Sequence, residues 1–228
     1  MASNCSESAP DSENQIHSDE LAKEYGFKGG LVPGVTVSAY LLHPVIESFG
    51  EAWLADGYAN CKVSSPLYDG ETFTVSSEIL KEGCHNTFLK NQEGRIIANA
   101  ESKLIKNKHP EPKYRGDPLV QENFKAPKAS FAIWDELKKE GCRAFEFHWG
   151  GKDPLIYLSD EGLLPEILQP KGGGFANLCF LLGCSNWILA GNAFMNPWVH
   201  LQTKSQNYKP VPFNTCLLYT SDAADEVD

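Results

Sequence analysis

The sequence predicts an α+β fold in which an antiparallel sheet wraps around a long apolar helix, and it predicts that this unit occurs twice. Three observations support this: a helical apolar stripe, a run of alternating strands after it, and a second helix–strand–turn series about 140 positions later. The chain has 228 residues, enough for one large or two small domains, and 42% of them are hydrophobic, enough for a core.

The first long helix is predicted over residues 34–56, where apolar side chains recur at spacings of three and four. Pro44 lies inside this range and removes one helical hydrogen bond, so we expect a kink or a break there. Before the helix, a polar turn carries His17, and a short helix is predicted over residues 19–25 with Ser18 as its cap. The apolar stripe consists of Val35, Ala39, Leu42, Ile46, Phe49 and Trp53.

Four strands follow this helix and alternate in the manner of half-buried strands. One long helix followed by a run of antiparallel strands is the hotdog layout, a sheet wrapped on a helix. The next stretch, residues 106–130, is rich in Lys and Pro and is predicted to be a connector. The strands are predicted over residues 58–64, 72–80, 85–90 and 95–105, with turns at 66–70 and 91–94.

The second half repeats this order. Gly34 and Gly174 differ by 140 positions, and Pro66 and Pro210 differ by 144. We therefore predict a double hotdog, with an N-terminal hotdog domain at residues 1–105 and a second, incomplete one at residues 131–215. In that second unit the sequence predicts a helix over residues 175–190, a turn at 209–212, and strands at 143–149, 155–158 and 198–205.

Residues 216–228 are predicted to be a non-native tail, because Cys-Leu-Leu-Tyr-Thr-Ser-Asp-Ala-Ala-Asp-Glu resembles the conceptual translation of a sequencing adapter. On this interpretation the natural chain continues beyond Thr215 and the second unit is cut short. We then expect the tail to pack against nothing and a strand edge near residues 200–205 to remain open. A genuine acidic tail is the alternative.

Composition excludes several functional classes. A formal net charge of −10 disfavours nucleic-acid binding, and no apolar run is long enough to span a membrane. The N-terminus has no leader-like segment, so we expect a cytoplasmic protein with reduced thiols. The seven cysteines show no metal-ligand spacing, and neither dinucleotide nor phosphate-loop motifs occur, so no metal or resident cofactor is expected.

Asn14, Ile16 and His17 precede a glycine-rich approach to the long helix that ends at Gly34. This order resembles the signature of the MaoC-like acyl dehydratases, which include the (R)-specific enoyl-CoA hydratases and which have the hotdog fold. The resemblance covers about residues 11–105. The family signature runs Asp-x-Asn-Pro-Ile-His; here Gln15 replaces the proline, and the position of the catalytic Asp is Ser12.

The resemblance implies roles for particular residues. His17 would act as base and acid, Asn14 would orient the water, and the N–H of Gly34 would bind the thioester oxygen, with Val32 and Pro33 shaping the entry. Asp11 stands one position before the family Asp and could serve only if the loop bulges by one residue. From the residues alone, a loop-capping histidine and an ordinary turn glycine remain open alternatives for His17 and Gly34. The other histidines, His200 included, show no ligand spacing.

The predicted activity is the reversible hydration of a trans-2-enoyl-CoA to a 3-hydroxyacyl-CoA, a hydro-lyase reaction of fatty acid metabolism. Coenzyme A would be the substrate carrier, with Lys28 and Arg95 as candidate phosphate contacts, and the acidic chain disfavours an acidic carrier protein. Two alternatives remain: a non-catalytic acyl-CoA-binding or subunit-pairing module, because Ser12 breaks the acid–base pair, and a hotdog thioesterase. A homodimer is also open.

Overall fold

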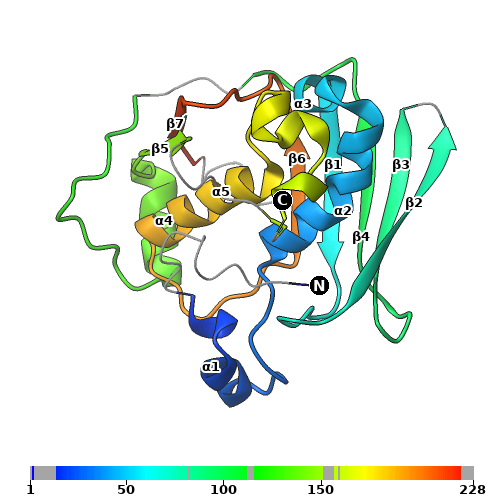
Figure 1. The fold of residues 1–228 in the computed structure, drawn as a ribbon. Helices are drawn as coiled ribbons and strands as arrows, with labels where there is room; N and C mark the ends of the chain where they lie inside the picture. Colours follow the sequence, from blue (N-terminus) through cyan, green and yellow to red (C-terminus); the bar gives the residue numbers. More distant parts are fainter. Residues whose placement is uncertain are drawn as a thin grey trace.

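The computed structural model describes residue 2 and residues 14–81, 83–111, 116–150, 157–158 and 160–221. A curved antiparallel sheet wraps around helix α2 (Gly34–Phe49), and a second long helix, α5 (Leu178–Asn192), lies beside α2 (Figure 1). This is the α+β hotdog arrangement that the sequence predicts. No helix in the described part of the chain is long and apolar enough to cross a membrane.

The strands of the first unit begin and end within one residue of their predicted limits. They form one antiparallel sheet in the order β2-β3-β4-β1, and β6 from the second half extends it beyond β1. The tight turns rely on left-handed glycines, such as Gly94 with φ +76° in the hairpin loop. The elements of this unit are α1 (Asp19–Glu24), α2, α3 (Glu51–Asp56), β1 (Gly57–Val63), β2 (Phe73–Lys81), β3 (Cys84–Asn91) and β4 (Ile96–Leu104).

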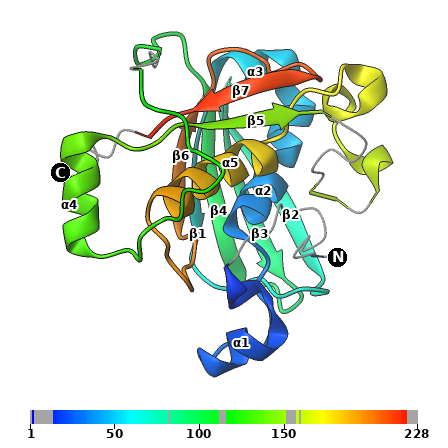
Figure 2. The ribbon, with the colours of Figure 1, turned by 90° about the vertical axis from the view of Figure 1, so that its left-hand side faces the viewer.

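The first half of helix α2 is buried on every side because it has packing partners on every side. All of its residues from Val35 to Leu42 are buried. The sheet covers one face, and α5 packs against another (Figure 2). The sequence suggested a kink or a break at Pro44, but the helix is not broken there. It continues to Phe49 and ends at Gly50, whose φ of +55° is incompatible with helix continuation.

The second unit contains α5 and three strands among the described residues. Strands β5 (Phe145–Trp149) and β7 (Thr215–Tyr219) form a separate two-stranded antiparallel sheet, whereas β6 (Gln202–Gln206) pairs with β1. The predicted strand at residues 155–158 is not present at residues 157–158, and its first two residues lie outside the described part. Helix α4 (Phe131–Glu140), which starts after the cap Ser130, was not predicted.

A pseudo-twofold relation links the two units with a constant offset of 144 residues. Across the β1–β6 pair, Val63 N donates to Leu201 O and Asn207 N donates to Gly57 O, both at 2.8 Å. Adding 144 to Val63 and to Gly57 gives Asn207 and Leu201, so the first bond maps onto the second. The two bonds therefore flank a local symmetry axis between β1 and β6.

The same offset holds away from this axis. Val32 N donates to Leu67 O at 2.8 Å, and its counterpart Ala176 N donates to Val211 O at 2.9 Å. These bonds tie the chain before each long helix to the turn after the following strand. Bonds that match so far from the axis support the predicted duplication.

The offset of 140 at Gly34 is wrong, because the glycines before α5 are not at its first turn. Gly173 and Gly174 have positive φ values of 118° and 59° and form a turn, after which the cap Asn177 precedes Leu178. Leu178, not Gly174, is thus the counterpart of Gly34.

The expectation that residues 216–228 pack against nothing is wrong for the first part of that segment. Strand β7 runs to Tyr219 and pairs with β5 along its whole length, with Phe145 opposite Tyr219. The hydroxyl of Tyr219 donates to Leu181 O of α5 at 2.9 Å. The second unit therefore extends past Thr215. Residues 222–228 lie outside the described part, and the non-native origin of the segment stays a prediction.

The open edge expected near residues 200–205 lies at β6, but that strand does not belong to a second sheet. One edge of β6 pairs with β1, and no described strand pairs with its other edge. In the first unit, two strands, β3 and β4, separate β2 from β1. In the described part of the second unit, β6 and β7 lie in different sheets, and no counterparts of β3 and β4 occur between them. That the second unit is incomplete stays a prediction.

Candidate active site

His17 is held by backbone contacts on both sides of a tight loop. It ends the short turn η1 (Gln15–His17), and the Ser18 side chain then caps α1 by accepting from Leu21 N. The Nδ1 atom of His17 lies 2.8 Å from Leu31 O. A carbonyl oxygen can only accept, so Nδ1 carries the proton and Nε2 keeps its lone pair.

Gly30 is required at this loop because the backbone approaches itself closely there. A Cβ on Gly30 would collide with the carbonyl oxygen of His17, and Gly30 N donates to the carboxylate of Asp19 at 2.7 Å. This contact fixes the distance between the His17 turn and the strand-like stretch that leads to α2. Gly30, in the glycine-rich segment before α2, is therefore needed for the packing of the His17 loop.

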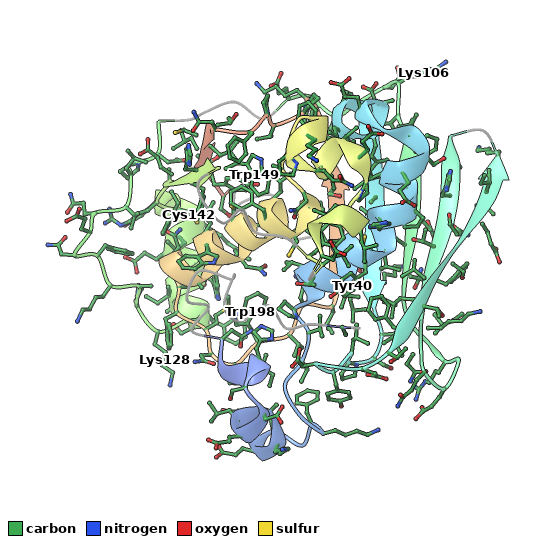
Figure 3. The ribbon with its side chains drawn as sticks, in the orientation of Figure 1. Tyr40, Lys106, Lys128, Cys142, Trp149 and Trp198 are labelled. Carbon is green, nitrogen blue, oxygen red and sulfur yellow. The ribbon has the colours of Figure 1, made fainter. Side chains whose placement is uncertain are left out.

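Asn14 links the His17 turn to the second half of the chain. Its Nδ2 donates to Trp198 O at 2.9 Å, and its Oδ1 accepts from Trp198 N at 3.3 Å. The same Nδ2 lies 3.5 Å from Nε2 of His17, which agrees with a lone pair on that atom. Asn14 is buried, and Trp198 lies beside the N-terminal end of α2 (Figure 3). Asn14 thus braces the loop by binding it to the second half of the chain.

Burial makes His17 a neutral imidazole at physiological pH. Desolvation, the larger effect, lowers the pKa of His17 below its usual value of 6.5, and the hydrogen bond to Leu31 O opposes this in part. A neutral ring with its proton on Nδ1 can accept a proton at Nε2, so His17 is in the state that a general base requires.

The N-terminus of α2 faces the same region. Thr36 N and Val37 N both donate to Pro33 O, while the N–H groups of Gly34 and Val35 precede the helical bonding pattern. These groups lie at the positive end of the helix dipole. Position 34 requires a glycine for a steric reason, because a Cβ there would lie 2.6 Å from Cβ and 2.9 Å from Cγ of His200. Close approach of His200 therefore explains Gly34 without reference to a ligand.

A cavity of about 850 Å³ joins these groups. Its volume is in the range of small-molecule sites. Asn14, His17, Val32, Pro33 and Gly34, the described residues to which the sequence assigned roles, all line it. Asp11 and Ser12 lie outside the described residues. Lys28 and Arg95 do not line the cavity.

The second unit forms much of the cavity wall. Helix α5 contributes a face that extends from Cys179 to Gly191, about 18 Å at 1.5 Å per residue. A Cβ on Gly183 would meet no atom within 4 Å, so this face is open at the middle of the helix. Of the described lining residues, Lys125 alone is a lysine, arginine or carboxylate. The wall is therefore mostly apolar, and its α5 part consists of Cys179, Gly183, Asn186, Trp187, Ala190 and Gly191.

The symmetry-related position in the second unit is closed. The pocket there measures about 30 Å³, and its lining includes Asn177, Leu178 and Val211, the counterparts of Pro33, Gly34 and Leu67. The side chain of Asn177 accepts from Phe180 N at 3.0 Å and so occupies the first turn of α5. Of the two related positions, the one beside His17 is open to a ligand.

Sequence reasoning did not find Trp198, His200 or the α5 face. Trp198 and His200 reach the site because β6 pairs with β1, a contact between segments about 140 residues apart, and α5 reaches it by packing against α2. The repeat was the available signal, since the strand after each helix in a duplicated hotdog can pair with its own counterpart. His200 was set aside because no second ligand-type residue follows it at a regular spacing.

No protein-family model matches the chain, and no curated protein matches it in sequence. Solved structures do resemble it. A conserved protein of Mycobacterium tuberculosis, essential for bacterial survival during infection and with a double hotdog fold, matches with a TM-score of 0.50 and 10% identity over 96% of this chain and 79% of that one.

Two further structures match less closely in shape. A Chloroflexus aurantiacus protein described as a MaoC domain dehydratase has a TM-score of 0.47 and 10% identity over 88% of this chain and 69% of its own. A Novosphingobium aromaticivorans protein described as a thioesterase has a TM-score of 0.46 and 13% identity over 83% and 74%. Together with the strand order and the offset of 144, the mycobacterial match shows that this chain has the double hotdog fold.

Proposed function

We propose that this chain catalyses the reversible hydration of trans-2-enoyl-CoA thioesters to 3-hydroxyacyl-CoA. One observation carries the proposal: a neutral imidazole, His17, shares a cavity of about 850 Å³ with the N-terminus of α2. A proton acceptor and a positive helix end on one cavity are the two groups that addition of water to an enoyl thioester needs. The resemblance of residues 14–34 to the MaoC-like signature supports the same reaction.

The reaction assigns one step to each group. A water held by Nε2 of His17 and the amide of Asn14 gives its proton to Nε2 as its oxygen bonds to the β-carbon of the enoyl group. The π electrons move toward the carbonyl, and the negative charge on the thioester oxygen is stabilised by the N–H of Gly34. His17 then returns the proton to the α-carbon, so one molecule of water has been added. Dehydration is the reverse sequence.

The apolar α5 face gives the acyl chain its binding surface. It extends about 18 Å along α5, which favours an acyl group well beyond four carbons. Val32 and Pro33 lie where the chain would pass the N-terminus of α2. Lys125, an exposed cation among the lining residues, is the candidate contact for a phosphate of coenzyme A.

A non-catalytic acyl-CoA-binding module is the second candidate. The observation in its favour is that the described lining residues include no carboxylate, the group that best stabilises an imidazolium during proton transfer. Ser12, which stands where the family signature has Asp, is consistent with this alternative.

The test follows the enoyl absorbance of crotonyl-CoA and dodecenoyl-CoA in the presence of the protein, with a thiol reagent in a parallel assay. We expect loss of the enoyl absorbance without thiol release, and a fall in kcat of about 10²-fold or more in His17→Gln. His109→Gln, which alters a histidine outside the cavity lining, is the matched control. Binding without turnover would favour the binding module, and thiol release would indicate a thioesterase.

A further inference from the structure

His200 lies directly against the N-terminus of α2. It precedes β6 and therefore belongs to the second unit, yet it lines the same cavity as His17. Its Cβ and Cγ occupy the space that a side chain on Gly34 would need. The cavity thus has two imidazoles, one from each unit, and the second one stands beside the helix end that would bind the thioester oxygen.

The backbone around His200 is fixed on both sides. Trp198 exchanges two hydrogen bonds with the side chain of Asn14, and Leu201 O accepts from Val63 N at 2.8 Å. Two residues after His200, β6 begins at Gln202, which lies opposite Lys62, and Thr203 lies opposite Cys61. A side chain whose supporting segment is tied to two elements of the first unit is preorganised, as catalytic groups are.

The polar contacts of His200 leave one ring nitrogen for a ligand. Its Nε2 is hydrogen-bonded to the hydroxyl of Thr203, and the structure gives its Nδ1 no partner among the described residues. When the Thr203 hydroxyl donates to Nε2, the proton of the neutral ring lies on Nδ1. In that tautomer the ring is a hydrogen-bond donor at Nδ1, the nitrogen bonded to the Cγ atom that lies against Gly34.

We propose that His200 is a further catalytic residue of this site, which donates a hydrogen bond from Nδ1 to the thioester oxygen next to the first N–H groups of α2. The negative charge that develops on this oxygen during hydration would strengthen the bond in the transition state. This inference rests on the proposed hydratase function. It also gives the second unit a chemical role in addition to lining the cavity.

Two readouts test His200, one of which does not need turnover. Hexadienoyl-CoA has an absorbance that moves to longer wavelength when its carbonyl is polarised, and it can be titrated into each variant. We expect a red shift with the unmodified protein and its loss in His200→Gln, while His109→Gln keeps it. In the crotonyl-CoA assay we expect kcat to fall by about 10²-fold in His200→Gln with little change in KM, the usual size for one lost oxyanion donor.

Thr203→Val separates a chemical role of His200 from a structural one, since it keeps the imidazole and removes the hydroxyl that is hydrogen-bonded to Nε2. We expect an intermediate loss of both the red shift and kcat, with recovery in Thr203→Ser. Unchanged red shift and kcat in a folded His200→Gln protein would overturn the role of His200 and leave the hydratase intact. Turnover and binding both absent in the unmodified protein would instead overturn the proposed function.

Discussion

The contact between Gly34 and His200 makes a stability prediction that can be worked out from distances. In Gly34→Ala the new Cβ would lie 2.6 Å, 2.9 Å and 3.0 Å from Cβ, Cγ and O of His200. Carbon atoms pack best at about 3.5–4.0 Å, so at least one contact is too short by about 1 Å. Overpacking of this kind costs about 1–3 kcal/mol, against a gain of at most about 1 kcal/mol from replacing a helical glycine.

A double-mutant cycle isolates the steric part. His200→Gly removes the two side-chain atoms that the new Cβ at position 34 would meet and leaves only the carbonyl oxygen. We therefore expect Gly34→Ala to destabilise the unmodified protein and to be close to neutral in the His200→Gly background. The coupling energy should be about 1–2 kcal/mol, within the range seen for residues in contact.

Urea denaturation at constant pH measures each corner of the cycle. With a slope of about 2–3 kcal/mol per molar urea, a coupling of that size moves the midpoint by roughly 0.3–1 M. Gly183→Ala is the matched control, because a Cβ there meets no atom within 4 Å and should stabilise α5 by up to about 1 kcal/mol. Effects of Gly34→Ala and His200→Gly that add within about 0.5 kcal/mol would refute the proposed contact.

Three other predictions concern the cavity and its loop. Asn14→Leu leaves both backbone polar groups of Trp198 without their partner. We therefore expect the free energy of unfolding, measured by heat or urea, to fall by about 1–3 kcal/mol and amide exchange at Trp198 to become faster. Unchanged exchange would contradict the bracing role of Asn14. Gly183→Phe fills the open face of α5. Calorimetry should then show a larger loss of affinity for dodecenoyl-CoA than for crotonyl-CoA. Equal losses would exclude α5 as the surface that binds the acyl chain. The folded-state pKa of His17 lies below its unfolded value near 6.5, so its contribution to stability is complete above that pH and is lost as pH falls through the folded value. The free energy of unfolding of His17→Gln should therefore depend less on pH below about 6.5 than that of the unmodified protein.

The first unit could be predicted closely because its signals are local. Strand limits follow from alternation and from turn glycines such as Gly94, and the cap Ser18 precedes its helix by one position. The prediction at Pro44 was wrong about a break because a single lost hydrogen bond does not end a helix whose preceding residues are buried on every side. The helix ends at Gly50, because this glycine adopts a positive φ. The position of a proline does not predict such a backbone conformation.

The candidate site was only half predictable. Residues 14–34 contain the His17 loop and the helix end in one stretch, so their proximity follows from sequence order. Trp198 and His200 join them through the β1–β6 pairing, which no local pattern specifies. The glycines at 173 and 174 also hid the true register, because they form a turn before α5 and not its first residues.

The constant offset of 144 has an evolutionary consequence. In a dimer of identical chains, every substitution appears at both symmetric sites, so neither can change alone. Here the two copies are covalently joined, and each position can diverge without its twin: one helix start has Gly34 and an open cavity, and the other has Leu178 with Asn177 folded over it. Because the copies are fused, the second copy is free from selection for a site of its own. Its surface, from α5 to His200, can then be selected as part of the cavity beside His17 in the first copy.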